Sequence, residues 1–109
     1  MTPWDVYQWE FPYGEHPAVI VSPHDRCVNP DIETVNVVGC SSRRASRGPA
    51  AHEVMLDKED GLDWETLARC DVLYLARKTE LLRRRGTVTY ERRRAIGEKV
   101  IRLFGLWLP

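Results

Sequence analysis

The hydrophobic residues in the first part of the chain occur in short stretches that are typical of β-strands. In residues 6–11 aromatic side chains alternate with polar ones, which predicts a strand with one buried face. Residues 17–22 are almost continuously apolar, so they predict a central strand covered on both faces. Residues 34–40 are rich in β-branched side chains and predict a third strand. A polar loop, in which one helical turn fits, is expected at 22–30.

The middle of the chain alternates between polar turns and short apolar stretches, which predicts further strands before a final helix. Residues 68–75, ARCDVLYL, favour an extended backbone because they contain aliphatic and aromatic side chains. The other predicted elements are, in chain order, a polar basic loop at 42–49, a strand at 52–56, a turn at 57–61, one helical turn at 77–82 and a short strand at 86–88.

A helix is predicted over residues 90–104, because apolar side chains recur there at three- and four-residue spacing. Thr89 stands at the N-cap position and Gly105 is a natural C-terminal stop. Gly97 inside the helix predicts either close packing at that point or a weak helix. We expect the apolar stripe of the helix to lie in the core. The stripe consists of Ile96, Val100, Leu103, Phe104 and Trp107.

Short strands separated by turns, with one terminal helix, predict a mainly β fold. In this fold a small, strongly bent antiparallel sheet or barrel is capped by the helix. We expect the 109 residues to form one domain over 1–109, which buries roughly 65% of the surface of the unfolded chain. No apolar run approaches the ~18 residues of a membrane span, and no secretory signal is visible. We therefore expect a cytoplasmic protein without a membrane contact.

The three cysteines, Cys27, Cys40 and Cys70, are an odd number without C-x-x-C spacing. This pattern favours reduced thiols over a disulfide framework. We expect Cys40 and Cys70 to pack as small apolar side chains. A metal site has little support from the sequence, and no cofactor is expected.

The net charge of zero hides an uneven distribution. Residues 1–68 carry 12 acidic and 5 basic side chains, whereas residues 69–109 carry 4 acidic and 11 basic ones. Such a division indicates either an anionic partner for the basic half or neutralisation within the molecule. Of the 16 basic residues, 13 are arginine, which favours forked recognition of phosphate over a merely positive surface.

Arg69, Cys70 and Asp71 form the chemically most suggestive stretch. In a strand, side chains two positions apart share a face, so Arg69 and Asp71 would project together while Cys70 turns into the core. A guanidinium matches phosphate oxygens and a carboxylate can accept a proton, which suits phosphate chemistry. The alternative is an ordinary ion pair screened by solvent, and these three residues alone favour it.

The sequence resembles the MazF/PemK/Kid family, which are toxins of type II toxin–antitoxin systems, in a series of motifs that keep the same order. The motifs are DVYQWEF at 5–11, HPAVIVS at 16–22, CSS at 40–42, EVML at 53–56, GLD at 61–63 and RCD at 69–71. The resemblance implies an SH3-like antiparallel barrel of the MazF/CcdB type with a C-terminal helix, assembled as a homodimer. It also implies a metal-independent endoribonuclease that cleaves single-stranded RNA and is restrained by a cognate antitoxin protein.

The resemblance also implies roles for individual residues. Arg69 and Asp71 match the catalytic arginine and aspartate of the PemK/Kid branch, and Ser41 stands where the family usually has threonine. His16 stands where the family usually has an arginine before the proline. We assign Asp71 as the base or its orienter and Arg69 to charge stabilisation. We assign His16 as the acid, because histidines titrate near pH ~6.5 whereas arginine seldom releases its proton.

RNA-binding residues are expected in the first turn and in the basic loop after the third strand. An exposed aromatic ring can stack on a base, for which Tyr13 and Trp64 are the candidates, although burial suits Trp64 equally well. A Ser-Ser pair at a strand end is usually turn chemistry, so Ser42 has this alternative too. The expected RNA-binding residues are Ser42, Arg43, Arg44, Arg47 and Tyr13.

Two other interpretations stay open at this point. The chain is compatible with a non-catalytic binding module that shares the fold, either a gyrase poison of the CcdB type or a degenerate relative that binds only RNA or an antitoxin. It is also compatible with a structural role for the charges, in which the arginine-rich half pairs with the acidic half across a dimer.

Overall fold

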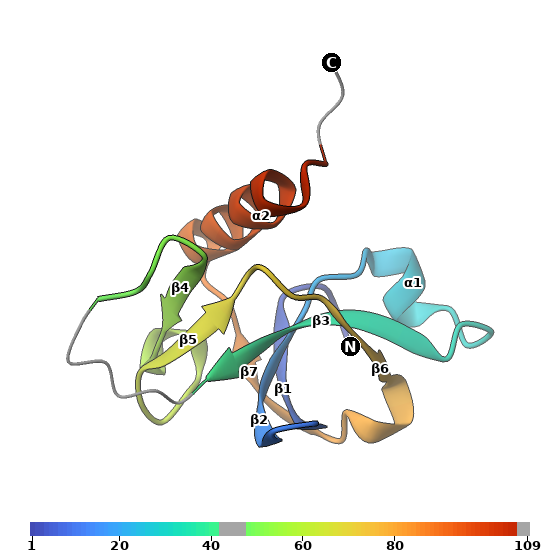
Figure 1. The fold of residues 1–109 in the computed structure, drawn as a ribbon. Coiled ribbons are helices and arrows are strands. Elements are labelled where there is room, and N and C mark those ends of the chain that lie inside the picture. Colours follow the sequence, from blue (N-terminus) through green and yellow to red (C-terminus); the bar gives the residue numbers. More distant parts are fainter. Residues whose placement is uncertain (42–47, 107–109) are drawn as a thin grey trace.

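A strongly curled antiparallel sheet forms the body of the protein, and one long helix lies across it (Figure 1). The structure is a computed structural model that describes residues 1–41 and 48–106. Within these residues the sheet has seven strands in the order β4-β5-β3-β2-β1-β7, and β6 pairs with β3 beside this path. This mainly β architecture with a C-terminal helix confirms the predicted fold class.

Most elements predicted from the sequence are present, with small shifts in their bounds. The helix α2 has the predicted bounds, and its N-cap and C-cap positions are Thr89 and Gly105 as expected. The strands are β1 (Asp5–Phe11), β2 (Gly14–Ile20), β3 (Thr34–Ser41), β4 (Glu53–Leu56), β5 (Thr66–Arg69), β6 (Tyr74–Arg77) and β7 (Arg83–Thr87). The helices are α1 (His24–Val28), α2 (Tyr90–Phe104) and the short 3-10 turns η1 (Lys58–Asp60) and η2 (Lys78–Glu80).

The single strand predicted at 68–75 is wrong, because the chain forms two strands there with a turn at 70–73. Both strands pair with β3, but in different registers. β5 pairs Ala68 with Cys40, whereas β6 pairs Tyr74 with Val37. Between these two pairs β3 has 2 residues, whereas the chain from β5 to β6 has 5. The extra residues cannot all pair with β3, and they form a turn. Asp71 therefore lies on a turn and not on the strand that carries Arg69.

The sheet separates two hydrophobic clusters. One lies between the sheet and α2, where Ile96 is the fully buried side chain of the helix. The other lies on the opposite face, where α1 contributes Cys27 and the segment after η2 contributes Leu81. The strands contribute Val6, Val19, Val38, Cys40, Val54, Leu56 and Ala68 to the first cluster and Phe11, Ala18, Ile20, Val35, Val37 and Ala76 to the second.

The apolar stripe of α2 is buried only in part, so the expectation that it forms core is wrong for its second half. Leu103 and Phe104 are exposed, while Val100 packs at the edge of the first cluster. A groove of about 280 Å³ lies between the middle of α2 and residues such as Trp4. Trp107, the last residue of the predicted stripe, lies outside the described residues.

All three cysteines are free and buried. Burial raises the pKa of the Cys70 thiol to about 11 and also raises the pKa of Cys40. Both side chains are fully buried in the first hydrophobic cluster, which confirms that Cys40 and Cys70 pack as small apolar side chains.

Two further features concern metals and membranes. Within residues 1–41 and 48–106, no three side chains of His, Cys, Asp or Glu are grouped so that they could hold a metal ion. No helix in this part of the chain has both the length and the apolar character needed to cross a membrane.

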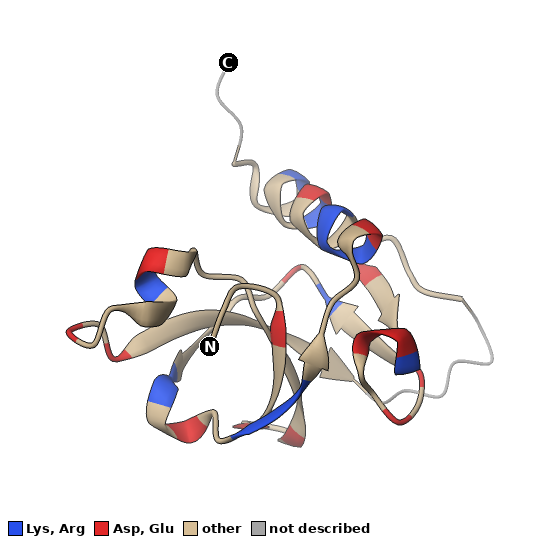
Figure 2. Cartoon of the chain, turned by 180° about the vertical axis from the view of Figure 1, so that it is seen from behind, with Lys and Arg blue, Asp and Glu red and all other residues tan. Residues whose placement is uncertain are grey.

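The division of charge along the sequence is partly neutralised within the molecule (Figure 2). Arg84 pairs with Asp5 at 3.3 Å, and Arg85 pairs with Asp63 at 2.9 Å. Arg92 makes a third contact between the basic and acidic halves, with the acidic turn η1. Neutralisation within one chain, which was one of the two predicted alternatives, therefore accounts for these arginines.

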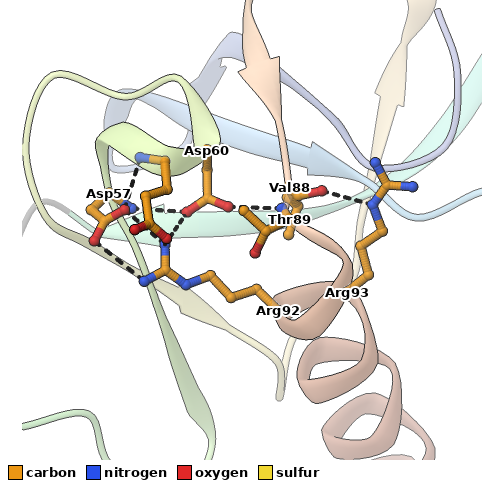
Figure 3. Close-up of polar contacts among 7 residues, drawn as sticks. Asp57, Asp60, Val88, Thr89, Arg92 and Arg93 are labelled. Carbon is orange, nitrogen blue, oxygen red and sulfur yellow. Dashed lines mark hydrogen bonds and ion pairs between the residues drawn. The ribbon is translucent and has the colours of Figure 1, made fainter.

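The contact of Arg92 with η1 clamps the start of α2 to the turn between β4 and β5 (Figure 3). The Asp60 side chain is fully buried, and its carboxylate accepts hydrogen bonds from Arg92 Nη1 at 2.6 Å and from the Thr89 backbone N–H at 2.9 Å. Asp57 Oδ1 accepts from the same Arg92 nitrogen at 2.7 Å. This bond lowers the pKa of Asp57, and it raises the pKa of Arg92. The Thr89 side chain makes no capping hydrogen bond. The Asp60 carboxylate instead accepts the hydrogen bond of a backbone N–H at the start of the helix.

We predict that Arg92→Met lowers the free energy of unfolding at pH 7 by about 2–3 kcal/mol, because it leaves a buried carboxylate without its cation. The pKa of Asp57 lies below its ordinary 3.8 in the folded protein. The stability that Asp57 contributes is therefore present above pH 3.8 and is lost as the pH falls through the lower folded value. Urea denaturation from pH 7 to pH 3 should show the wild type and Arg92→Met converging in stability.

The matched control for this prediction is Arg94→Met, whose exposed ion pair with Glu98 spans 3.8 Å. It should change the stability by less than about 0.5 kcal/mol at any pH. Equal losses in the two variants would contradict the role given to the clamp.

Candidate functional site

Arg69 and Asp71 meet at the end of β5, as the sequence predicted, although not on one strand. Arg69 Nη2 lies 3.4 Å from Asp71 Oδ2, and the two side chains are 46% and 36% exposed. An ion pair with this exposure contributes little to stability. Both groups are therefore free to contact a ligand from solvent.

His16 and Ser41 lie on the face of the sheet to which Arg69 belongs. The ladders pair Ala18 of β2 with Gly39 of β3. Arg69 lies one residue beyond the pair of Ala68 with Cys40, and Gly39 lies one residue before it. Opposite residues and residues two apart share a face, so these three polar side chains project from the same side of the curled sheet.

Tyr13 links the first turn to the central strand on this face. Its ring stacks on Phe11 with centroids 5.1 Å apart and lies 4.9 Å from the ring of His16. The Tyr13 hydroxyl covers Gly39 so closely that a Cβ at that position would lie 2.7 Å from it. Glycine is therefore required at Gly39 for Tyr13 to reach across the sheet.

The electrostatics of Tyr13 also connect it to the predicted site. Burial is the main reason why the pKa of Tyr13 is raised to about 12, and nearby Tyr74 adds to this effect. The positive charge of Arg69 acts in the opposite direction and lowers the pKa. Tyr13 thus contacts His16, and its hydroxyl is protonated at neutral pH.

Some predicted site residues are not joined directly. In the described part of the chain, no hydrogen bond or ion pair connects His16 with Arg69 or Asp71. The backbone carbonyl of Ser41 accepts a hydrogen bond from Thr66 Oγ1 at 2.7 Å. Four predicted RNA-binding residues, Ser42, Arg43, Arg44 and Arg47, lie outside the described residues.

A small hollow next to His16 was not predicted from the sequence. It has a volume of about 70 Å³ and lies between β1, β2, β7 and the segment before β5. The exposed Trp64, one of the two aromatic side chains considered for stacking, stands beside it. The other residues that line the hollow are Gln8, Glu15, Pro17, Leu62, Thr66 and Arg85.

The groups on this face suit chemistry on an anionic ester. A guanidinium stays charged and can hold an oxyanion. A carboxylate and an imidazole can exchange protons with a bound molecule. Arg69 and Asp71 are in contact, and His16 projects from the same face of the sheet.

Several solved structures have a similar fold. A mycobacterial endoribonuclease in complex with its cognate antitoxin is 24% identical with a TM-score of 0.80, and the match covers 100% of this chain and 99% of the other. The MazF-mt6 toxin of Mycobacterium tuberculosis is 20% identical with a TM-score of 0.77 over 95% of this chain and 99% of the toxin. A MazE–MazF complex of Deinococcus radiodurans is 18% identical with a TM-score of 0.75 over 98% and 97%.

The sequence itself matches no protein-family model and no curated protein. The similarity in structure therefore establishes a MazF-like fold for the whole length of the chain, as the sequence motifs implied.

We predict that Gly39→Ala destabilises the protein by about 1–3 kcal/mol, because the added methyl group collides with Tyr13 and Phe11. The matched control is Gly97→Ala in α2, where an added Cβ meets nothing within 4 Å. Of the two predictions for Gly97, close packing or a weak helix, the open space around it favours the weak helix. Alanine is the better helix former, so this control should stabilise the protein by up to about 1 kcal/mol. Urea denaturation of both variants measures the difference, and effects of the same sign would contradict the close contact.

Proposed function

We propose that this protein is an endoribonuclease toxin of the MazF type, which cleaves single-stranded RNA without a metal ion or cofactor and is restrained by an antitoxin. One observation carries the proposal. The exposed pair of Arg69 and Asp71 lies on the same sheet face as His16, in a chain whose whole length has the MazF-like fold. An enzyme of this kind acts in the cytoplasm, where its RNA substrate is found.

The proposed reaction uses the 2′-hydroxyl of the RNA as the nucleophile. Asp71 takes the proton of this hydroxyl, directly or by orienting another base, and the 2′-oxygen bonds to phosphorus. Arg69 stabilises the negative charge that develops on the phosphate oxygens. As the bond from phosphorus to the 5′-oxygen breaks, His16 gives its proton to that oxygen. The products are a 2′,3′-cyclic phosphate and a 5′-hydroxyl end.

The proposed binding surface surrounds these groups. Tyr13 presents an exposed ring on which a base can stack. Ser41 at the end of β3 is placed to bind phosphate or the 2′-hydroxyl. The basic residues that follow it are proposed to contact the RNA backbone, since arginine matches phosphate in a forked geometry. They are Arg43, Arg44 and Arg47, together with the neighbouring Ser42.

We predict that the purified protein cleaves a long single-stranded RNA in the presence of EDTA. Asp71→Ala, Arg69→Ala and His16→Ala should each lower the cleavage rate by about 100-fold or more, because each removes a group that acts on the reacting atoms. Arg94→Ala is the matched control for Arg69, since Arg94 is an exposed arginine on α2 that pairs only with Glu98 in the described residues. Gel analysis of the fragments over time measures the rates.

Undiminished cleavage in all three site variants would contradict the assignment. RNA binding by the wild type without any cleavage would instead favour the alternative of a non-catalytic binding module.

We also propose that the protein forms a homodimer through the second half of α2. Three apolar side chains of this half, Ile101, Leu103 and Phe104, are exposed, as is Leu106 just after the helix. Phe104→Glu should convert a dimer into a monomer in analytical ultracentrifugation, because it places a charge in an apolar contact. Tyr90→Glu, at the other end of the helix and also exposed to solvent, should leave the dimer intact. A monomeric wild type at micromolar concentration would contradict this proposal.

The antitoxin is the second protein partner that we propose. The complexes of similar toxins with an antitoxin support it. A short gene next to this one that encodes a DNA-binding protein, and whose product binds this chain on co-expression, would identify the partner. Failure of that product to bind would count against it.

A further inference from the structure

We propose that the hollow beside His16 is a subsite for one nucleobase of the RNA, with Trp64 as the stacking surface and Glu15 as the group that selects guanine. The proposal rests on the proposed function, because it concerns how the RNA is recognised. It adds a binding site on the opposite side of His16 from Tyr13, formed by β1, β2, β7 and the segment before β5.

The hollow exists because two strands of the sheet diverge. β2 pairs with β3 only over 18–20, so its first half is bonded to β1 alone. Near this point Thr66 Oγ1 donates a hydrogen bond to the backbone carbonyl of Ser41 on β3. The space left between β2 and the segment before β5 is about 70 Å³ and admits the edge of a base while its face stays outside.

One wall of the hollow is held rigid by hydrogen bonds. The Arg85 side chain is 11% exposed and donates to Gln8 Oε1 at 2.7 Å and to Asp63 Oδ2 at 2.9 Å. Since the oxygen of the Gln8 amide is used by Arg85, its NH₂ group is the part that remains to donate. The hollow therefore presents a fixed donor next to Glu15.

Trp64 supplies the flat surface that a base needs. Its ring is 63% exposed and makes no ring contact within the described residues. An exposed indole beside a polar hollow is the arrangement by which proteins stack single-stranded bases. A base on Trp64 would insert its polar edge toward Gln8 and Glu15.

Glu15 gives the subsite its preference. Its carboxylate is exposed, faces Glu10 across the β1–β2 ladder, and has no cation as partner in the described part of the chain. Two carboxylates in this position repel each other, and hydrogen-bond donors from a ligand would relieve the repulsion. Guanine alone presents two adjacent N–H donors, N1–H and N2–H, on its Watson–Crick edge. In the other bases an acceptor lies next to the donor and would face the carboxylate unfavourably.

Arg83 lies close to the hollow and could pair with the RNA phosphate next to the bound base. Arg83 is opposite Gln8 in the β1–β7 ladder, and its exposed side chain makes no ion pair within the described residues. Arg84 and Arg85 next to it are both paired with acidic residues. His16 also lines the hollow, so the subsite adjoins one of the proposed catalytic residues.

The test measures the binding of short RNAs that cannot be cleaved because every 2′-hydroxyl is methylated. Each has uridine at all positions except one, which carries guanosine, inosine or adenosine. Fluorescence anisotropy at constant salt should show the wild type binding the guanosine RNA several-fold more tightly than the inosine RNA, which lacks the N2 amino group. Glu15→Gln should abolish this difference, whereas Glu98→Gln on α2 should preserve it. Trp64→Ala should weaken binding of all three RNAs about tenfold.

The control for Trp64 is Tyr90→Ala, which removes an aromatic ring that is 72% exposed on α2 and should leave the binding unchanged. Equal affinity of the wild type for guanosine and inosine RNAs, or unchanged binding by Trp64→Ala, would overturn the subsite while RNA cleavage by the wild type still supported the proposed function. Binding that depends on Trp64 and Glu15 without any cleavage of ordinary RNA would support the subsite and overturn the nuclease. An absence of both binding and cleavage would overturn both.

Discussion

The candidate site depends on how the central strand β3 pairs along its two edges. One edge pairs with β2, and the other pairs first with β5 and then with β6 in a different register. The change of register expels residues 70–73 from the ladder, which buries Cys70 and leaves Asp71 at the surface beside Arg69. The ion pair is thus a consequence of strand pairing. A guanidinium at a strand end and a carboxylate on the following turn are both held, yet both remain accessible to a ligand.

Close packing on the same strand brings the first hairpin to this site. Gly39 allows the hydroxyl of Tyr13 to lie directly against the backbone of β3, and Tyr13 in turn contacts the ring of His16. A larger residue at this position would push Tyr13 away from β3 and disturb its contact with the ring of His16. One register change therefore brings Arg69 and Asp71 together, and one glycine allows the contact of Tyr13 with β3.

Much of the fold could be predicted from the sequence, because alternating and β-branched stretches are buried on this sheet and the final helix has clear ends. The break within residues 68–75 could not, since ARCDVLYL contains neither glycine nor proline and only the pairing with β3 interrupts it. The spacing of apolar residues identified one face of α2 but could not show which part of that face packs on the sheet. Leu103 and Phe104 were therefore wrongly expected in the core. The pairing of Arg69 with Asp71 was predicted from strand alternation, and it is present although Asp71 lies on the turn after β5.

Long-range contacts account for what the sequence left open. Some arginines of the basic half pair with the acidic half of the same chain, and others stay available to an anionic partner. Arg92 is paired with η1, whereas Arg83 projects into solvent. The hollow beside His16 combines residues from four separate segments, which no local pattern of Gln8 or Glu15 could indicate. Sequence reasoning located the chemically reactive groups better than it located the surfaces that would hold a substrate.

The central claim is that Arg69, Asp71 and His16 cleave RNA through its own 2′-hydroxyl. The most direct measurement is mass spectrometry of the fragment ends that the wild-type protein produces in EDTA. The account predicts fragments with a 2′,3′-cyclic phosphate at one end and a 5′-hydroxyl at the other. Fragments with a 3′-hydroxyl and a 5′-phosphate, which require water as the attacking group, would contradict it.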